Sequence, residues 1–232
     1  GQKALSEQKA LSPQQHLSIT THLSAPSLTS EPNNDRQAQV VSAKSITIDV
    51  APRDFLQVNT LLNQKMLTTA REWVNDFLDT QGDVYKLFDF FCGSGNFSLA
   101  LAEFFATVEG FEGVQTMVDA ARKNAAYNAQ LDGVNNCEFS CLDLKDKASI
   151  KRLSIDNKAV VLLDPSREGA RELCEVLLDS CACMIIYVSC NPNSFARDAK
   201  ILRQRYDVEK IVALDMFPYT KHLELMAMFT RK

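Results

Sequence analysis

The chain has 232 residues, of which 46% are hydrophobic and 23% charged, so it can bury one good core with extensions but not two large domains. Its formal net charge of -4 excludes a general electrostatic attraction to nucleic-acid phosphates, and any such contact must be local. From residue 193 onward, eight Lys or Arg stand against five Asp or Glu. The C-terminal end is therefore the locally basic part.

Seven cysteines are scattered through apolar segments, with no CxxC pair and no histidine at a zinc-ligand spacing. This usage is typical of a reduced protein, and we expect a cytoplasmic one. No apolar run approaches the roughly 18 to 20 residues of a membrane span, and the N-terminus lacks a secretory pattern. We therefore predict no membrane association. Because the chain begins with Gly, we also expect a piece of a longer protein.

Residues 1–42 are rich in Ser, Thr, Gln, Asn and Pro and lack a sustained apolar period. They are predicted to be a flexible polar linker or insert. The catalytic domain is expected over residues 43–232, opening with a strand at 45–50 and an ordered lead-in at 54–59.

Apolar residues at helical spacing then predict a helix that ends near residue 82: Met66, Ala70, Trp73 and Phe77. Five short apolar runs predict buried strands, at residues 84–91, 107–112, 137–144, 158–164 and 183–190. Helices are predicted between them, one from residue 97 and one with an apolar stripe at Val114, Val118, Ala121 and Ala125. This alternation predicts an α/β fold with a mostly parallel sheet covered by helices. Two further runs, 208–217 and 222–231, predict an antiparallel hairpin at one edge.

The segment FDFFCGSGNF places a glycine turn between a strand and a helix, where backbone N–H groups can approach a ligand closely. Ser98 stands where the dinucleotide fingerprint needs a third glycine, which makes a pyrophosphate less suitable. An ordinary glycine turn is the alternative. Glu112 ends the next strand, where a carboxylate would accept hydrogen bonds from ribose hydroxyls or, alternatively, place charge near a helix N-terminus.

Several polar residues follow predicted strands, and the ends of parallel strands are where open α/β sheets bind ligands. Asp164 precedes a proline turn, and Asp143 is either a partner for an adenine edge or a solvated turn residue. Cys190 follows its strand and precedes an Asn-Pro turn, a position suited to a reactive thiolate; as one of seven cysteines, its alternative role is that of a small hydrophobe. Glu224 alone would be the solvent-facing residue of an edge strand, and Gln57 a polar loop residue.

Taken in order, the segments DFLQVN, NQKM, FCGSGNFSLALA, GFEGV, LLDPSREGA, YVSCNP, ARD and LDMFPYTKHLE resemble the RNA (uracil-5-)-methyltransferase family from about residue 51 to the C-terminus. The LDPSREGA and LDMFPYTKHLELM segments look like the branch that acts on 23S ribosomal RNA and has an N-terminal iron-sulfur module. They depart from the transfer-RNA branch, which shows a DPPR-type turn and FDQFPYTHHME.

The resemblance implies a Rossmann-like class I methyltransferase fold, methyl transfer from S-adenosylmethionine to carbon 5 of uridine in 23S ribosomal RNA, and a rRNA-processing role. It aligns six residues with the family's contacts to this cofactor: Gln57, Phe91, Asn96, Glu112, Asp143 and Asp164. Cys190 aligns with the nucleophile and Glu224 with the proton acceptor. No residue of the chain is predicted to bind a metal. Since no cysteine precedes Cys92, the ligands of a 4Fe-4S cluster and the upstream RNA-binding β-barrel are expected outside this chain.

In the implied reaction, the Cys190 thiolate adds to carbon 6 of uracil and Glu224 later removes the proton from carbon 5. The uridine must be single-stranded or flipped out to reach such a site. Four residues could contact phosphates or form a solvated helix face: Arg197, Lys200, Arg203 and Arg205. The other functions weighed are a transfer-RNA uracil methyltransferase, a nicotinamide-dependent oxidoreductase, and a cofactor-binding module that is inert without its RNA-binding domain.

Overall fold

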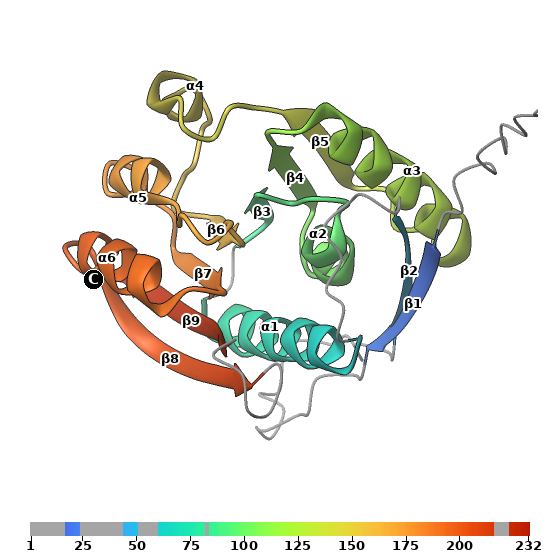
Figure 1. Ribbon diagram of the computed structural model, residues 1–232, viewed down its shortest axis with the longest axis horizontal. Helices are drawn as coiled ribbons and strands as arrows, with labels where there is room; N and C mark the ends of the chain where they lie inside the picture. Colours follow the sequence, from blue (N-terminus) through green and yellow to red (C-terminus); the bar gives the residue numbers. More distant parts are fainter. Residues whose placement is uncertain (1–16, 24–43, 51–59, 82–83, 216–222) are drawn as a thin grey trace, which may run out of the picture.

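The computed structural model describes residues 17–23, 44–50, 60–81, 84–215 and 223–232. Its centre is a seven-stranded sheet with the strand order β5-β4-β3-β6-β7-β9-β8 (Figure 1). The strands are β3 (Lys86–Phe90), β4 (Thr107–Glu112), β5 (Cys137–Cys141), β6 (Ala159–Leu163), β7 (Met184–Ser189), β8 (Tyr206–Asp215) and β9 (Leu223–Arg231). The five strands from β5 to β7 pair in parallel, whereas β9 pairs antiparallel with both β7 and β8. The predicted α/β fold with a mostly parallel sheet and a C-terminal hairpin is confirmed.

Helices cover both faces of this sheet (Figure 1). They are α1 (Thr60–Gln81), α2 (Asn96–Leu101), the 3-10 turn η1 (Ala102–Phe104), α3 (Gln115–Asp132), α4 (Lys147–Lys151), α5 (Arg171–Leu177) and α6 (Pro192–Leu202). The central strand β6 and its neighbour β7 are buried at every position, because both faces of the sheet are packed against helices. One large core lies under α1 and α2 and another under α5 and α6, and a smaller third cluster joins α3 to Cys92 and Phe139.

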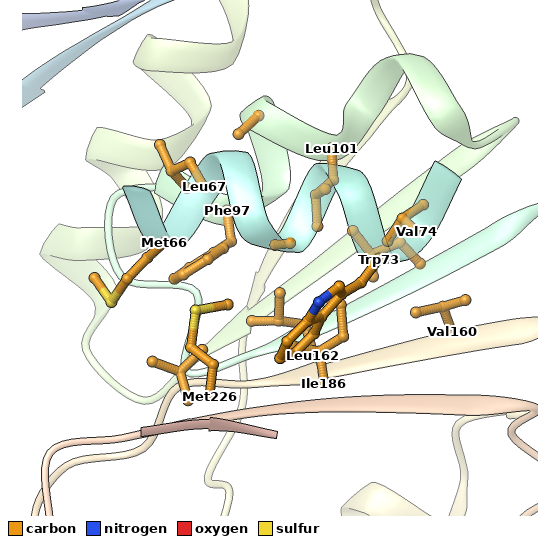
Figure 2. Packing of buried hydrophobic residues seen from close by; sticks show 14 of the residues in the cluster. Met66, Leu67, Trp73, Val74, Phe97, Leu101, Val160, Leu162, Ile186 and Met226 are labelled. Carbon is orange, nitrogen blue, oxygen red and sulfur yellow. The ribbon is translucent and has the colours of Figure 1, made fainter. Parts of the chain in front are cut away.

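The core under α1 shows why the predicted helix forms. Figure 2 shows Met66, Leu67, Trp73 and Val74 of α1 packed over side chains of α2 and of strands β6, β7 and β9. All four residues of the predicted stripe of α1 are buried. The stripe predicted for α3 is wrong at its first residue, since Val114 is 50% exposed. Val114 has an extended backbone just before the helix, so its side chain does not share the buried face of α3.

A separate two-stranded sheet lies beside α1 and α3 and pairs β1 (Leu17–Leu23) with β2 (Lys44–Val50) in antiparallel register. The strand at β2 was predicted, whereas β1 lies inside the segment that we expected to be a polar linker. The expectation misses β1 because only alternate residues of LSITTHL are apolar, and the strand becomes stable only when its inner face is covered. Leu23 and Ile46 are buried there.

The C-terminal hairpin lies at one edge of the sheet, as predicted, and the structure adds the order of its two strands. β9 lies between β7 and β8, so β8 is the outer strand of the hairpin and β9 is an interior strand. Glu224, at the start of β9, is consequently only 4% exposed and is not the solvent-facing residue of an edge strand. Over the residues described here, no helix combines the length and the apolar character that crossing a membrane requires.

Candidate functional site

A cavity of about 790 Å³ opens at the carboxyl ends of β3, β4, β6 and β7, next to the start of β9. Neighbouring β3 and β6 begin the two halves of the sheet, and ligands of open α/β sheets bind at this switch in strand order. The lining residues named in the sequence analysis are Phe91, Asn96, Glu112, Asp164, Cys190 and Glu224. Six of the eight predicted site residues therefore meet in one cavity. Gln57 lies outside the described residues.

The floor of the cavity is the glycine turn that joins β3 to α2. Gly93 and Gly95 have φ angles of 55° and 92°, a conformation that glycine adopts without steric cost. A Cβ at Gly95 would also lie 3.2 Å from the ring of Phe139. Phe91 has a φ of 64°, and it is the one non-glycine residue with positive φ in the described chain. Such strain at a ligand-binding turn is common in functional sites.

The side chain of Glu112 ties this turn to the end of β4. Its Oε2 accepts a hydrogen bond from the backbone N–H of Gly93 at 3.3 Å, and its Oε1 accepts one from Val114 at 3.0 Å. The second contact places charge near the start of α3, which is one of the two roles weighed for this residue. Because the carboxylate also lines the cavity, it remains available to a ligand there as well.

Asn96 is held by a partner that the sequence did not reveal. The amides of Asn96 and Asn63 exchange two hydrogen bonds, at 2.7 and 3.2 Å, between the first turns of α2 and α1. Both side chains line the cavity. The only sequence sign of Asn63 is a polar residue beside the apolar stripe of α1. The pair presents fixed amide groups to whatever occupies this part of the cavity.

Asp89 was also missed, although an acid inside an apolar strand is a sequence feature that can be noticed. It is 1% exposed, lines the cavity, and accepts a hydrogen bond from the Ser98 hydroxyl at 2.5 Å. Ser98 thus has a structural reason to replace the third glycine of the dinucleotide fingerprint. Burial raises the pKa of Asp89 to about 7. Its Oδ1 has no hydrogen-bond partner among the residues described, which is costly for a buried oxygen unless a ligand satisfies it.

Three titratable groups line the cavity at the ends of β6 and β7 and at the start of β9. Asp164 follows β6, Cys190 follows β7, and Glu224 lies on β9, where the neighbouring Leu225 pairs with Ser189 of β7. All three line the cavity, and their charges influence one another. The fold therefore brings a thiol and two carboxyl groups, which are up to 60 residues apart in the chain, into one place.

Burial dominates the acid–base behaviour of this group. It raises the pKa of Asp164 to about 8, with further contributions from Glu224 and Asp89. It raises the pKa of Glu224 to about 7, while the guanidinium of Arg167 opposes the shift. Burial and then the charges of Glu224 and Asp164 raise the pKa of the Cys190 thiol. A carboxyl group with a pKa near neutrality can act as a proton acceptor at physiological pH.

Asp143 is not brought to the cavity. It is exposed, and its carboxylate accepts a hydrogen bond from the backbone N–H of Lys145 at 2.9 Å in the turn after β5. This geometry corresponds to the turn residue that was weighed as its alternative role. Asp143 is a less suitable candidate for a cofactor contact than the residues that line the cavity.

The four basic residues predicted to contact phosphates lie on α6 (Arg197 and Lys200) and just after it (Arg203 and Arg205), and they do not form one uniform surface. Arg197 donates hydrogen bonds to Asp198 and to the backbone carbonyl of Glu168, so it holds the loop after β6. Lys200, Arg203 and Arg205 are exposed. Within the described parts of the chain, no group of three or more His, Cys, Asp or Glu is placed to hold a metal ion.

Comparisons with known proteins identify the family of the chain. The model of the tRNA (Uracil-5-)-methyltransferase family matches residues 2–232. A protein of Alteromonas mediterranea described as 23S rRNA (uracil(1939)-C(5))-methyltransferase RlmD is 41% identical over 80% of this chain and 37% of its own. A protein of Erwinia tasmaniensis with the same description is 40% identical over 81% of this chain and 41% of its own. The chain thus spans less than half the length of the curated relatives that it matches.

Solved structures give the same picture. The Pyrococcus abyssi tRNA (uracil-54, C5)-methyltransferase in complex with S-adenosyl-L-homocysteine is similar with a TM-score of 0.64 and 26% identity, over 91% of this chain and 50% of that one. The magnesium protoporphyrin IX methyltransferase of Synechocystis PCC 6803 has a TM-score of 0.56 at 16% identity, over 75% of this chain and 81% of that one, a likeness that shows the fold alone. The chain belongs to the tRNA (uracil-5-)-methyltransferase family.

Proposed function

We propose that this chain transfers a methyl group from S-adenosylmethionine to carbon 5 of a uridine in RNA, with Cys190 as nucleophile and Glu224 as proton acceptor. The observation that carries the proposal is the meeting of Cys190, Asp164 and Glu224 in one cavity beside a glycine turn. A second candidate nucleophile is less suitable, since Cys92, the other cysteine that lines the cavity, is buried and its pKa is raised strongly by burial.

The residues present fit S-adenosylmethionine. When bound, this cofactor supplies an electrophilic methyl group on a positively charged sulfur. We assign the Glu112 carboxylate, which lines the cavity, to the ribose hydroxyls. The Asn96 amide and the Oδ1 of Asp89, which has no partner among the described residues, offer further polar contacts. Four carboxyl groups, those of Asp89, Glu112, Asp164 and Glu224, line this mainly apolar cavity and favour a cationic ligand, because the positive charge also stabilises their ionised forms. We retain Phe91, Asp164 and, outside the described residues, Gln57 as proposed cofactor contacts. Asp143 is not proposed.

The first chemical step needs a nucleophile, because carbon 5 of uracil is too electron-poor to attack a methyl donor unaided. The Cys190 thiolate forms a bond to carbon 6, and the electron pair of the 5,6 double bond moves toward carbon 5 and the neighbouring carbonyl. Carbon 5 then takes the methyl group, and the electron pair of the broken methyl–sulfur bond stays on the sulfur, which leaves as the thioether of S-adenosylhomocysteine. The raised pKa of Cys190 means that the thiol must lose its proton when substrate and cofactor enter. The cofactor's positive charge favours that loss.

The second step restores the aromatic base. Glu224 removes the hydrogen that remains on carbon 5, the double bond forms again, and the bond between Cys190 and carbon 6 breaks to release the thiolate. A pKa of about 7 suits this task, since the carboxylate is substantially ionised at neutral pH and basic enough to accept the proton. Because Glu224 is 4% exposed, bulk water does not compete for it.

The RNA substrate we propose is 23S ribosomal RNA, on the basis of the two relatives near 40% identity. The target uridine must be single-stranded or flipped out of a helix, because the reacting groups lie inside a cavity. We further propose that residues 43–232, together with β1, which pairs with β2 and lines the cavity, form the catalytic unit. RNA-binding and iron-sulfur modules are proposed to lie elsewhere in the full protein. We also propose that the protein acts in the cytoplasm, which its free cysteines support.

Methyl transfer from labelled S-adenosylmethionine tests this proposal. The chain is incubated with 23S ribosomal RNA fragments, transfer RNA, or 23S fragments in which carbon 5 of uridine is already methylated. We expect label only in the unmethylated ribosomal fragments, recovered as 5-methyluridine. Label in transfer RNA would favour the second candidate, a transfer-RNA enzyme such as the structural relative from Pyrococcus abyssi. Cofactor binding without transfer to either RNA would favour an inert module.

A further inference from the structure

The β1–β2 hairpin forms a wall of the cavity that the sequence analysis did not foresee. Side chains on its inner face, Ile19 and Thr21 of β1 and Ile48 of β2, line the cavity together with the glycine turn. β1 packs against α1, and β2 packs against α2 and α3. The hairpin therefore covers the part of the cavity in which Asn63 and Asn96 lie.

Specific hydrogen bonds fix the hairpin over the turn. The amide of Asn124 on α3 donates to the carbonyl of Asp49 in β2 at 3.2 Å and to the carbonyl of Ser94 in the glycine turn at 3.0 Å. One side chain thus connects both walls of the cavity. The amide of Asn128 bonds the backbone N–H and carbonyl of Thr47, so β2 is held at two points. The inner face of the hairpin has a defined position relative to the turn.

Thr21 is a polar residue among the aliphatic side chains of this inner face. The outward-facing polar residues of the hairpin bond one another across the strands, as Thr20 does with Thr47 at 3.0 Å and His22 with Ser45 at 2.7 Å. Thr21 is 3% exposed, and its hydroxyl has no hydrogen-bond partner within the described segments. Its neighbours on the inner face are Ile or Leu, so a valine of the same shape would pack equally well. A buried, unpartnered hydroxyl that lines a cavity is explained by a ligand.

We infer that the hairpin is part of the cofactor site and that the Thr21 hydroxyl hydrogen-bonds the amino-acid end of S-adenosylmethionine. This inference rests on the proposed function. Glu112 at the end of β4 takes the ribose, and Cys190 and Glu224 at the other end take the methyl acceptor. Two polar parts remain, the adenine, which is bonded to the ribose, and the amino-acid end, which is bonded to the sulfur that carries the methyl group. We assign the amino-acid end to the region between the glycine turn and α1, under the hairpin, because this region adjoins both the turn and the reactive end of the cavity. Its carboxylate and ammonium group require polar partners in a cavity lined mainly by apolar atoms.

Comparing the affinities of two ligands distinguishes this contact from the other contacts in the site. S-adenosylhomocysteine has the amino-acid end, and 5′-deoxy-5′-methylthioadenosine lacks it but keeps the nucleoside and the sulfur. We expect Thr21→Val to weaken binding of S-adenosylhomocysteine about five- to tenfold, measured by calorimetric titration, with no change for methylthioadenosine. Thr20→Val, on the outer face of the same strand, is the matched control and is expected to change neither.

The outcomes are distinct. Equal losses for both ligands would place the hydroxyl at the nucleoside and overturn the inference, and so would unchanged affinities. Thr21→Val is expected to melt at or above the wild-type temperature, because the substitution replaces an unpartnered hydroxyl by a methyl group. A lower melting temperature together with loss of both ligands would also contradict the inference. If the wild-type chain binds no S-adenosylhomocysteine, the proposed function itself fails.

Discussion

At the scale of single residues, environment distinguishes Cys190 and Glu224 from other residues of their kind. Cys174 is buried away from the cavity and Cys141 is exposed, whereas Cys190 is partly buried on the cavity wall. Glu138 and Glu224 both lie on strands, but Glu138 is exposed whereas Glu224 is buried, and burial raises the pKa of Glu224 to about 7. The chemistry that we propose depends on these differences in burial, which residue type alone does not convey.

Replacing Glu224 by Gln keeps the shape of the side chain and removes the proton acceptor. We expect Glu224→Gln to methylate uridine but to release the RNA about 10²-fold more slowly than wild type, so that a covalent complex with ordinary RNA accumulates. Denaturing gel electrophoresis of labelled RNA measures this complex over time. Glu138→Gln, at an exposed position of β5, is the control. Release at the wild-type rate from Glu224→Gln would remove Glu224 from the proposed role.

Sequence patterns located the ends of strands but not the polar contacts between elements. Asp164 and Cys190 were found because each directly follows an apolar run. Asn63 was not, because its importance arises from a contact with Asn96 on another helix, 33 residues away. Asp89 could have been recognised from the sequence, because it is an acidic residue inside an apolar strand. The hydrogen bond from the Ser98 hydroxyl to Asp89 forms only in the folded turn, so the sequence alone does not reveal it.

At the scale of elements, the loop between β6 and α5 is held by α6. Asp198, which is fully buried, accepts hydrogen bonds from the backbone N–H of Ala170 and from the Tyr187 hydroxyl, both at 2.7 Å. Arg197 bonds Asp198 and the carbonyl of Glu168. This loop begins at Asp164 and carries Arg167, so the network positions one wall of the cavity.

A glycine pair tests how closely this loop packs. Gly169 has a φ of 80°, and a Cβ there would lie 2.4 Å from the carboxylate of Asp198; Gly133 has a φ of 75° and open space around it. Gly133→Ala is expected to lower the free energy of unfolding by about 1 kcal/mol, from backbone strain alone. Gly169→Ala adds a steric clash and is expected to cost about 3 kcal/mol. Urea denaturation measures the free energy of unfolding of both variants. Equal losses would show that the loop shifts to accommodate the added Cβ and is not closely packed.

The position of β9 shows that predicting the strands of a hairpin does not predict which of them pairs with the rest of the sheet. The two C-terminal strands were predicted as a hairpin from their patterns and short connection, but a hairpin can add to a sheet through either strand. The continuous apolar run from Leu225 to Phe229 is typical of an interior strand and favours the observed order. The β1–β2 pair was harder to predict, because 20 residues separate two strands whose polar faces dominate their composition.

At the scale of the whole molecule, the alternation of strands and helices was sufficient to predict the fold, because parallel strands with helical crossovers have few arrangements. The cavity follows from that fold, but its electrostatic cost does not appear in the sequence. Asp89, Asp164 and Glu224 have pKa values raised to about 7, 8 and 7 in one cavity. Keeping three ionised carboxylates there opposes folding.

The stability of the protein should therefore depend on pH. A carboxyl group whose pKa is higher in the folded state binds its proton more tightly there, so its stabilising effect is complete below the unfolded pKa and is lost as pH rises toward the folded value. We expect the free energy of unfolding to fall between pH 5 and pH 8, and Glu224→Gln to remove about 2 kcal/mol of that fall. Urea denaturation at both pH values measures it. An identical fall in wild type and variant would contradict this electrostatic interpretation.

The covalent step is the central claim, and trapping it is the most direct test. A ribosomal RNA fragment with 5-fluorouridine at the target is incubated with the protein and S-adenosylmethionine; fluorine cannot leave carbon 5 as a proton does, so the bond to Cys190 should persist. We predict a denaturation-resistant protein–RNA complex that requires the cofactor, is absent in Cys190→Ala and remains in Cys141→Ala. An undiminished complex in Cys190→Ala, or none from wild-type protein that methylates ordinary RNA, would contradict the mechanism.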